Sequence, residues 1–280
     1  MNILVTGGAD FIGSNFVQMA LAKGHRILNV DALTYAGNLE SLKNIAGDSA
    51  YVFTRADIAD KSKMAELLNH HKPDAIVNFA AESHVDRSID GPGAFVTTNV
   101  VGTYVMLDAA LAYWRGLAAG PREAFRFVHV STDEVYGSLG PEGRFTESSR
   151  YDPNSPYAAS KAAVCHYCEA VKGELAAQQI GVSILLPGPI KSNIHQAQLN
   201  RPDHLRAGSG FAESEAKLAQ REVSDSWMEP EEVGNMVADG ILADKTYIVT
   251  HGIFKDWQRA RAQAVLDATP DVDNAAVRGL

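Results

Sequence analysis

Residues 6–13, Thr-Gly-Gly-Ala-Asp-Phe-Ile-Gly, decide the fold of this chain. They follow an apolar stretch at residues 3–5 and precede an amphipathic one at residues 16–22. The glycines therefore lie between a predicted strand and a predicted helix. Gly7 suits the tight turn, and Gly13 lets the helix pack close to the strand. In this context the helix N-terminus is expected to face the pyrophosphate of a dinucleotide.

The second predicted strand, residues 26–30, ends on an acidic residue, Asp31. A carboxylate at this place accepts hydrogen bonds from both ribose hydroxyls and repels a 2′-phosphate. The sequence therefore predicts NAD as the cofactor rather than NADP. The alternative interpretation is a glycine turn that binds no ligand.

Asp10 departs from the glycine pattern, which calls for glycine where the backbone approaches the pyrophosphate. The aspartate adds a side chain and a negative charge beside two phosphates. A like-charge pair at about 4 Å costs on the order of a few kcal/mol at an effective dielectric of about 20. Rotation of the side chain toward solvent would reduce this cost. The sequence thus predicts weakened NAD binding.

Apolar strands alternate with helices along most of the chain. This alternation predicts an α/β fold with a doubly wound, mostly parallel Rossmann sheet of seven strands. No repeat or linker divides the sequence, so we expect one NAD-binding domain over residues 1–280. Further strands are predicted at residues 51–54, 75–80, 127–131, 182–186 and 246–250, and helices at 62–70, 94–115, 157–179, 229–242 and 256–266.

The composition of the 280 residues is that of a soluble globular protein, with 46% hydrophobic and 21% charged residues. A net charge of −9 argues against a nucleic-acid-binding surface. No apolar run approaches the roughly 18–20 residues of a membrane span, and the first residues lack the basic segment of a signal peptide. Cys165 and Cys168 cannot make a disulfide framework, so we expect a cytoplasmic protein. Two cysteines also fall short of the roughly four ligands of a zinc site, so no metal is expected.

Tyr157 and Lys161 lie four residues apart, on one face of a predicted helix. A nearby ammonium group lowers the pKa of a phenol, so Tyr157 can accept the proton of a substrate alcohol near neutral pH. Lys161 can also reach the nicotinamide ribose, and Thr132 can hold the same substrate oxygen as Tyr157. By itself such a Tyr-Lys pair is usually a solvated pair on a helix surface. The glycine loop, Thr132, Tyr157 and Lys161 in this order along the chain make a more specific combination.

Together these motifs resemble the short-chain dehydrogenase/reductase superfamily. Residues 1 to about 165 resemble the dTDP-glucose 4,6-dehydratases, which oxidise the sugar C4 hydroxyl with tightly held NAD, eliminate water across C5 and C6, and return the hydride to C6. The stretches that carry this resemblance are residues 31–42 (DALTYAGNLESL), 78–88 (NFAAESHVDRS), 98–103 (TNVVGT), 131–137 (STDEVYG) and 155–157 (SPY).

The resemblance implies roles for individual residues. Thr132 and Tyr157 would serve the oxidation, and Asp133 and Glu134 would be acid and base in the elimination. Ser83 and Thr132 would contact substrate. Without the resemblance, Asp133 and Glu134 are better explained as caps of the following segment. The implied NAD site comprises Gly7, Phe11, Ile12, Gly13, Asp31, Thr34, Asp57, Ile58, Ala80, Ala81, Thr98, Tyr157 and Lys161.

The resemblance changes after residue 162 or so. The dehydratases carry a further nucleotide-sugar-binding lobe, and nothing in this sequence resembles it. Residues 181–194 (GVSILLPGPIKSNI) instead resemble single-domain short-chain dehydrogenases. That likeness implies that Pro187 passes the nicotinamide and that Ser192 holds its carboxamide.

Three short stretches, residues 200–202, 206–210 and 227–230, are most similar to the Cα-dehydrogenases of lignin β-aryl ethers. We therefore expect a chimera, natural or engineered. Residues 1–165 would supply a dehydratase-like cofactor site and catalytic set. Residues 166–280 would supply a substrate loop and last strand of the short-chain dehydrogenase type.

Three functions remain open on the sequence. The first is an NAD-dependent oxidoreductase for a secondary alcohol, with residues 189–227 favouring an aryl or other apolar substrate. The second is a dTDP-glucose 4,6-dehydratase, a lyase acting on a nucleotide sugar, which the missing lobe disfavours because remote binding energy positions the sugar. The third is a folded but silent chimera that binds NAD weakly. For the active forms the resemblance implies a homodimer built on the two long helices.

Overall fold

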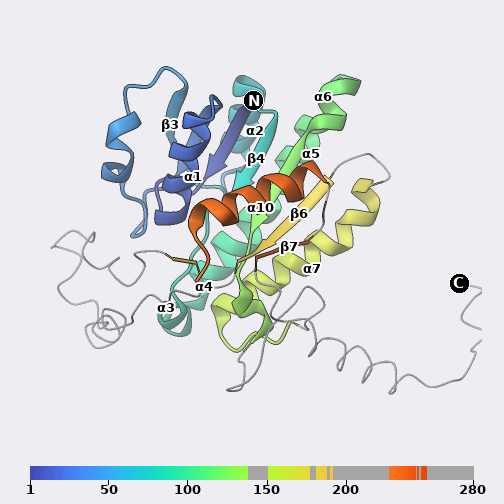
Figure 1. The fold of residues 1–280 in the computed structure, drawn as a ribbon. Coiled ribbons are helices and arrows are strands. Elements are labelled where there is room, and N and C mark those ends of the chain that lie inside the picture. Colours follow the sequence, from blue (N-terminus) through green and yellow to red (C-terminus); the bar gives the residue numbers. More distant parts are fainter. Residues whose placement is uncertain are drawn as a thin grey trace, which may run out of the picture.

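The computed structural model describes residues 1–137, 151–176, 181–187, 190–191, 227–243, 245 and 247–250. Within these ranges seven strands form one sheet in the order β3-β2-β1-β4-β5-β6-β7. Every neighbouring pair is parallel. The predicted doubly wound α/β fold is therefore confirmed (Figure 1).

The strands are short, and the central ones are apolar. Most residues of β1, β2, β4 and β5 are buried, as a parallel sheet covered on both faces requires. In chain order the strands are β1 (Asn2–Thr6), β2 (Arg26–Asp31), β3 (Tyr51–Arg55), β4 (Ala75–Asn78), β5 (Arg126–Val130), β6 (Gly181–Leu186) and β7 (Tyr247–Val249).

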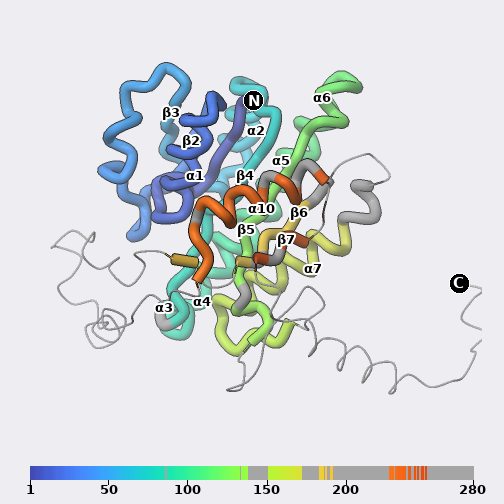
Figure 2. The backbone as a smooth tube through the Cα atoms, viewed as in Figure 1, coloured from blue at the N-terminus to red at the C-terminus, as the bar shows by residue number. Residues whose placement is uncertain are grey.

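Helices cover the two faces of the sheet and build two core clusters. One cluster lies under α2, α5 and α7, and the other lies under α1 and α10. Figures 1 and 2 show α10 crossing the sheet on the same side as α1. The described helices are α1 (Phe11–Ala22), the 3-10 helix η1 (Leu39–Ile45), α2 (Lys61–His71), α3 (Val85–Asp90), α4 (Pro92–Phe95), the π-helix η2 (Val96–Gly102), α5 (Thr103–Arg115), α6 (Ala119–Ala124), the 3-10 helix η3 (Asp133–Tyr136), α7 (Pro156–Ala176) and α10 (Pro230–Leu242).

Two helices differ from the sequence-based prediction. The helix predicted at residues 16–22 begins at Phe11, because Asp10 caps its first turn. The helix predicted at residues 94–115 is divided into α4, η2 and α5. A Cβ on Gly102, the last residue of η2, would lie 2.7 Å from the side chain of Ile58, so the helix passes very close to that residue.

The continuous helical stretch Pro92–Arg115 is long and apolar enough to cross a membrane by length and composition alone. Half of its most apolar window is buried inside the fold, as in the core helix of a globular protein. The sequence-based prediction that no apolar run approaches the length of a membrane span is therefore wrong for this helix. Polar residues such as Asn99 and Thr103 interrupt the run in the sequence, but both side chains are buried.

Strands from both predicted parts of the chain share the sheet, since β6 pairs with β5 and β7 pairs with β6. Glu169 on α7 strengthens this connection by accepting hydrogen bonds from the hydroxyls of Tyr151 (2.6 Å) and Tyr247 (2.8 Å). The single domain over residues 1–280 stays a prediction. The helix predicted at residues 256–266 lies outside the described residues, as does most of 189–226.

Candidate active site

The strand order reverses direction between β1 and β4, so the crevice beyond their carboxyl ends is where such folds bind ligands. Gly7 follows β1 with φ +67°, which favours glycine. A Cβ there would lie 2.6 Å from the amide nitrogen of Ala80, which follows β4. A Cβ on Gly13 would overlap the carbonyl oxygen of Gly7. Both glycines therefore have the packing roles that the sequence indicates.

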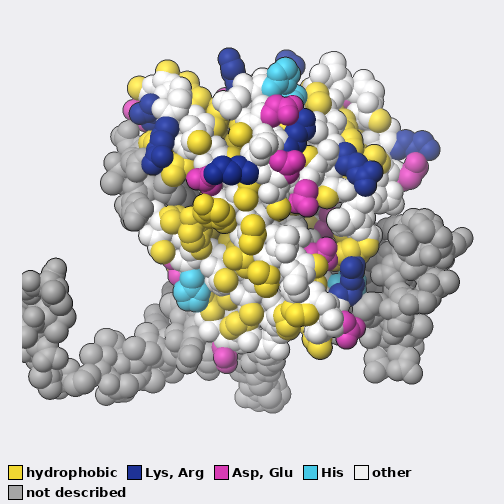
Figure 3. Space-filling view, turned by 180° about the vertical axis from the view of Figure 1, so that it is seen from behind, with side chains coloured by type: hydrophobic (Ala, Val, Ile, Leu, Met, Phe, Trp, Pro, Cys, Tyr) yellow, Lys and Arg dark blue, Asp and Glu magenta, His cyan; other side chains and the backbone are white. Residues whose placement is uncertain are grey.

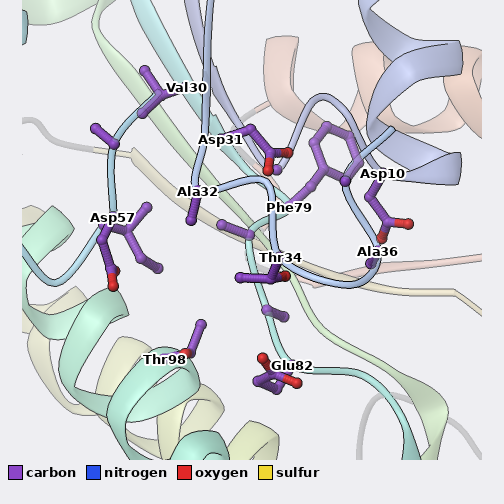
Figure 4. Close-up of a pocket in the computed structure, with 16 residues that line it drawn as sticks. Asp10, Val30, Asp31, Ala32, Thr34, Ala36, Asp57, Phe79, Glu82 and Thr98 are labelled. Atoms are coloured by element: carbon purple, nitrogen blue, oxygen red, sulfur yellow. The ribbon is translucent and has the colours of Figure 1, made fainter. Parts of the chain in front are cut away.

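A cavity lies at this crevice and collects many of the predicted cofactor-binding residues (Figure 4). They come from the loops after β1, β2, β3 and β4 and from η2. The predicted residues that line the cavity are Gly7, Asp31, Thr34, Asp57, Ile58, Ala80, Ala81 and Thr98.

The other predicted cofactor residues do not line this cavity. Phe11, Ile12 and Gly13 form the first turn of α1. Tyr157 and Lys161 lie on α7, and Pro187 follows β6. Ser192 lies outside the described residues. The roles of these residues stay predictions.

Asp31 is a nearly buried carboxylate at the end of β2, with 7% of the residue exposed. Its two oxygens accept hydrogen bonds from the backbone amides of Ala9 (2.9 Å) and Leu33 (2.8 Å). A carboxylate offers about four acceptor positions, so it can still accept from a ribose hydroxyl. Asp31 thus joins the glycine loop to the loop after β2 and remains available to a ligand.

Asp10 lines the same cavity and caps α1. Its Oδ1 accepts a hydrogen bond from the backbone amide of Phe11 at 2.6 Å. Burial raises the pKa of Asp10, and the nearby Asp31 acts in the same direction, against the effect of the Phe11 hydrogen bond. In Figure 4 Asp10 lies on the side of Ala36, across the cavity from Asp57.

Glu82 lines the cavity and was not singled out in the sequence. Its backbone N–H donates to the Asn99 side chain at 2.8 Å, and the amide of Asn99 donates to the Glu82 carbonyl at 3.0 Å. Its Oε2 is buried without a hydrogen-bond partner among the described residues. The only sequence signal for it is its place in the quoted stretch 78–88. The remaining lining residues, which carry no chemical signal, are Val30, Ala32, Ala36, Gly37, Ala56 and Phe79.

Lys161 is buried in α7, with 3% of the residue exposed, and its Nζ donates to the backbone carbonyl of Val130 at 3.0 Å. Burial lowers the pKa of Lys161 to about 8, and Cys165 opposes this shift. Tyr157, one turn earlier, is also buried, and its ring packs edge-on against Phe95 with centroids 6.2 Å apart. The lysine therefore ties α7 to the last residue of β5.

The predicted catalytic residues after β5 meet the same helix. Thr132 caps η3, because its Oγ1 accepts from the backbone amide of Glu134 at 3.3 Å. The sequence offered Asp133 and Glu134 as caps of this segment, but the cap is Thr132. The side chain of Asp133 lies outside the part of the chain that the structure describes. η3 packs against α7, and Ser131 Oγ lies 3.1 Å from Cys165 Sγ. The structure therefore brings the β5 end and the Tyr157–Lys161 helix together.

Ser83, predicted to contact substrate, follows β4. Its backbone amide donates to the hydroxyl of Tyr35 at 3.4 Å, and the guanidinium of Arg87 lies 3.8 Å from the centroid of that Tyr35 ring. Ser83 is not among the residues that line the cavity. Its substrate role stays a prediction.

His129 is a buried group that the sequence did not mark. The Asn78 amide donates to its Nδ1 at 3.1 Å, which leaves the proton of the neutral ring on Nε2. That Nε2 has no hydrogen-bond partner within the described ranges. Burial and the Lys161 charge lower the pKa of His129 well below its usual value, so the ring is neutral.

Residues 4–181 match the family described as GDP-mannose 4,6 dehydratase. The chain belongs to this family. A dTDP-glucose 4,6-dehydratase of Xanthomonas campestris pv. campestris is 59% identical over 167 residues, which are 60% of this chain and 48% of that protein. The dTDP-glucose 4,6-dehydratase 1 of Escherichia coli is 50% identical over 182 residues, 61% of this chain and 50% of that protein. The chain spans about half the length of these curated relatives.

Solved structures extend the likeness over more of the fold. The dTDP-glucose 4,6-dehydratase of Streptomyces venezuelae, solved with NAD bound, has a TM-score of 0.68 and 32% identity, covering 95% of this chain and 81% of that one. The enzyme of Bacillus anthracis, also in complex with NAD, has a TM-score of 0.66 and 30% identity, covering 90% and 76%. The dehydratase-like character of the N-terminal part is therefore confirmed.

Proposed function

We propose that this chain is an NAD-dependent dehydratase of a nucleotide sugar, with dTDP-glucose as its substrate. The observation that carries the proposal is the packing of η3 on α7, which joins the Thr132–Glu134 segment to the helix of Tyr157 and Lys161. The dTDP-glucose dehydratases at 50–59% identity support this substrate class over the secondary-alcohol oxidoreductase that the sequence favoured.

The cavity residues fit NAD in most respects. Gly7 and Gly13 leave room that a Cβ would fill, and Asp31 can receive a ribose. The buried Glu82 Oε2 is a further acceptor without a partner among the described residues. When bound, NAD supplies the acceptor and later the donor of a hydride. Among the described lining residues, Asp10 departs from this fit.

In the proposed reaction, Tyr157 accepts the proton of the sugar C4 hydroxyl as the C4 hydride leaves, and Thr132 holds the same oxygen. Glu134 then removes the C5 proton, and Asp133 protonates the C6 hydroxyl, which departs as water. A proton then returns to C5, and the bound cofactor would supply the hydride that reduces C6. Lys161 supports Tyr157 from the next turn of α7.

We propose that residues after about 165 come from another branch of the superfamily. The family match ends at residue 181, which supports a change of ancestry along the chain. A complete activity on a nucleotide sugar then requires that this second part hold the nucleotide.

We propose a homodimer in the cytoplasm. Large apolar side chains are exposed on α3, η2, α5 and α7, and hydrophobic side chains gather on the face in Figure 3, opposite α10. Light scattering on the purified protein tests the dimer, and a monomeric mass at micromolar concentration contradicts it. The exposed large apolar residues on these four helices are Ile89, Val96, Val101, Tyr104 and Tyr167.

Cys165 and Cys168 are free and buried, which fits a reducing compartment.

The activity is tested by incubating the protein with NAD and dTDP-glucose and following the keto-sugar product by mass spectrometry. Tyr157→Phe is expected to abolish the product. Tyr113→Phe is the matched control, because the Tyr113 hydroxyl donates to the carbonyl of Pro73, before β4, and Tyr113 does not line the cavity. Oxidation of a benzylic alcohol without dehydration of the sugar would favour the secondary-alcohol oxidoreductase. NAD binding without turnover of either substrate would favour the silent chimera.

A further inference from the structure

We propose that Asp10 determines which ligands the cavity accepts: its carboxylate admits an uncharged adenosine and disfavours the pyrophosphate of a dinucleotide. The inference rests on the proposed NAD site and concerns the strength of binding there. It makes Asp10 a specificity-determining residue.

The first step is the hydrogen bonding at the start of α1. The backbone amide of Phe11 donates to Asp10 Oδ1 at 2.6 Å, and the Ser14 amide donates to the Asp10 carbonyl at 2.8 Å. Phe11 carries one of the amides that a helix N-terminus offers to an anion. The chain's own carboxylate already holds it, so a phosphate must displace that carboxylate or bind without this donor.

The second step is the charge of the cavity. Its charged lining residues are Asp10, Asp31, Asp57 and Glu82, and none of the described lining residues is Lys, Arg or His. Among the residues that the structure describes at this site, backbone amides and the helix dipole are what offset the charge of a pyrophosphate. Asp10 already accepts the hydrogen bond of one of these amides, that of Phe11, and it adds a second negative charge beside the pyrophosphate. A nucleoside without phosphates is not repelled in this way.

The third step is the separation of the two halves of the cavity. Figure 4 places Asp10 beside Ala36, with Asp57 and Thr98 on the opposite side. Asp57 and Thr98 therefore lie away from Asp10, whereas the ribose acceptor Asp31 lies near it. Adenosine carries no charge that these carboxylates would repel. A change at Asp10 should alter the affinity for NAD and leave the affinity for adenosine as it is.

The raised pKa of Asp10 adds a pH dependence in the same direction. Protonation removes the like charge, so NAD affinity should increase as the pH falls toward the range where Asp10 titrates. The groups facing the cavity from the other elements, Asp31, Asp57 and Glu82, are also acidic. The Asp10→Asn variant separates their contribution from that of Asp10.

The experiment is calorimetric titration of NAD and of adenosine into the full chain and into Asp10→Gly, Asp10→Asn and Asp60→Asn. Asp60 is the matched control, because its side chain caps α2 by accepting from the Lys63 amide at 3.0 Å, and it does not line the cavity. We expect Asp10→Gly to tighten NAD at least about tenfold. We expect Asp10→Asn to tighten it by less and to lose the pH dependence. Adenosine affinity should stay within about twofold throughout.

Equal NAD affinity in the original chain and both Asp10 variants would overturn the inference and leave the NAD site standing. A parallel gain for adenosine would also overturn it, because the effect would then not depend on the pyrophosphate. If neither ligand binds any variant while all of them unfold cooperatively on heating, the proposed cofactor site itself is wrong. Asp10→Gly serves as the second variant if Asp10→Asn does not fold.

Discussion

Lys161→Met should change how the stability of the protein depends on pH. The folded state lowers the pKa of Lys161 from 10.5 to about 8, chiefly through burial. Below pH 8 the lysine is protonated in both states, and the buried charge destabilises the fold by a constant amount. Between pH 8 and 10.5 the unfolded chain binds more protons than the folded one, so this destabilisation is relieved as the pH rises.

The size of the effect follows from the two pKa values. With 10.5 for the unfolded chain and about 8 for the folded one, the original chain should gain about 2.5 kcal/mol relative to Lys161→Met between pH 7 and pH 10. The lost hydrogen bond to Val130 also changes the stability of the variant. The loss of this hydrogen bond shifts the stability difference between the two proteins by a similar amount at every pH. It therefore changes the size of that difference more than its dependence on pH.

Urea denaturation at a series of pH values measures the effect, and only the difference between the two proteins is compared. Groups away from Lys161 contribute equally to the stability of both proteins, so their contributions cancel in the difference. Lys43→Met is the control, because its side chain is 77% exposed and should show almost no such variation. A stability difference between the original chain and Lys161→Met that stays constant from pH 7 to pH 10 would refute the buried-charge explanation.

Three further substitutions follow from the geometry. Gly7→Ala forces a side chain into φ +67° and against the amide of Ala80, so we expect about 1–3 kcal/mol of destabilisation in urea and loss of adenosine binding by calorimetry. Tyr247→Phe removes the hydroxyl that donates to Glu169, and thermal unfolding should show a loss of about 1 kcal/mol. Asn99→Ala leaves a buried backbone N–H and C=O after β4 unpaired, so urea denaturation should show a loss of about 1–3 kcal/mol. Unchanged stability in any of the three would contradict the corresponding contact.

The sequence was most informative where function depends on local backbone geometry. Gly7, which adopts positive φ, and Gly13, which packs against the backbone of Gly7, belong to a clear glycine pattern, so both could be assigned before the structure. Asp31 could be placed because the carboxyl end of β2 falls beside that loop in a parallel sheet. Parallel strands and right-handed connections then left few topologies for the remaining strands.

Features that depend on packing between distant segments could not be predicted. The partner of Lys161 is a backbone carbonyl, which carries no residue-type signal. The π-helical turn of η2 arises where the helix passes against Ile58, a contact between segments more than forty positions apart. Glu82 could not be distinguished from a surface acid, because its burial depends on Asn99 and on the loop geometry after β4.

The most direct test of the proposed dehydratase is one incubation of the full chain with NAD and dTDP-glucose carrying deuterium at C4. The reaction derived from Tyr157, Asp133 and Glu134 predicts a keto sugar that has lost one water and carries the deuterium at C6, and no such product from Tyr157→Phe. A protein that binds NAD yet returns the sugar unchanged, with its deuterium still at C4, would contradict the account.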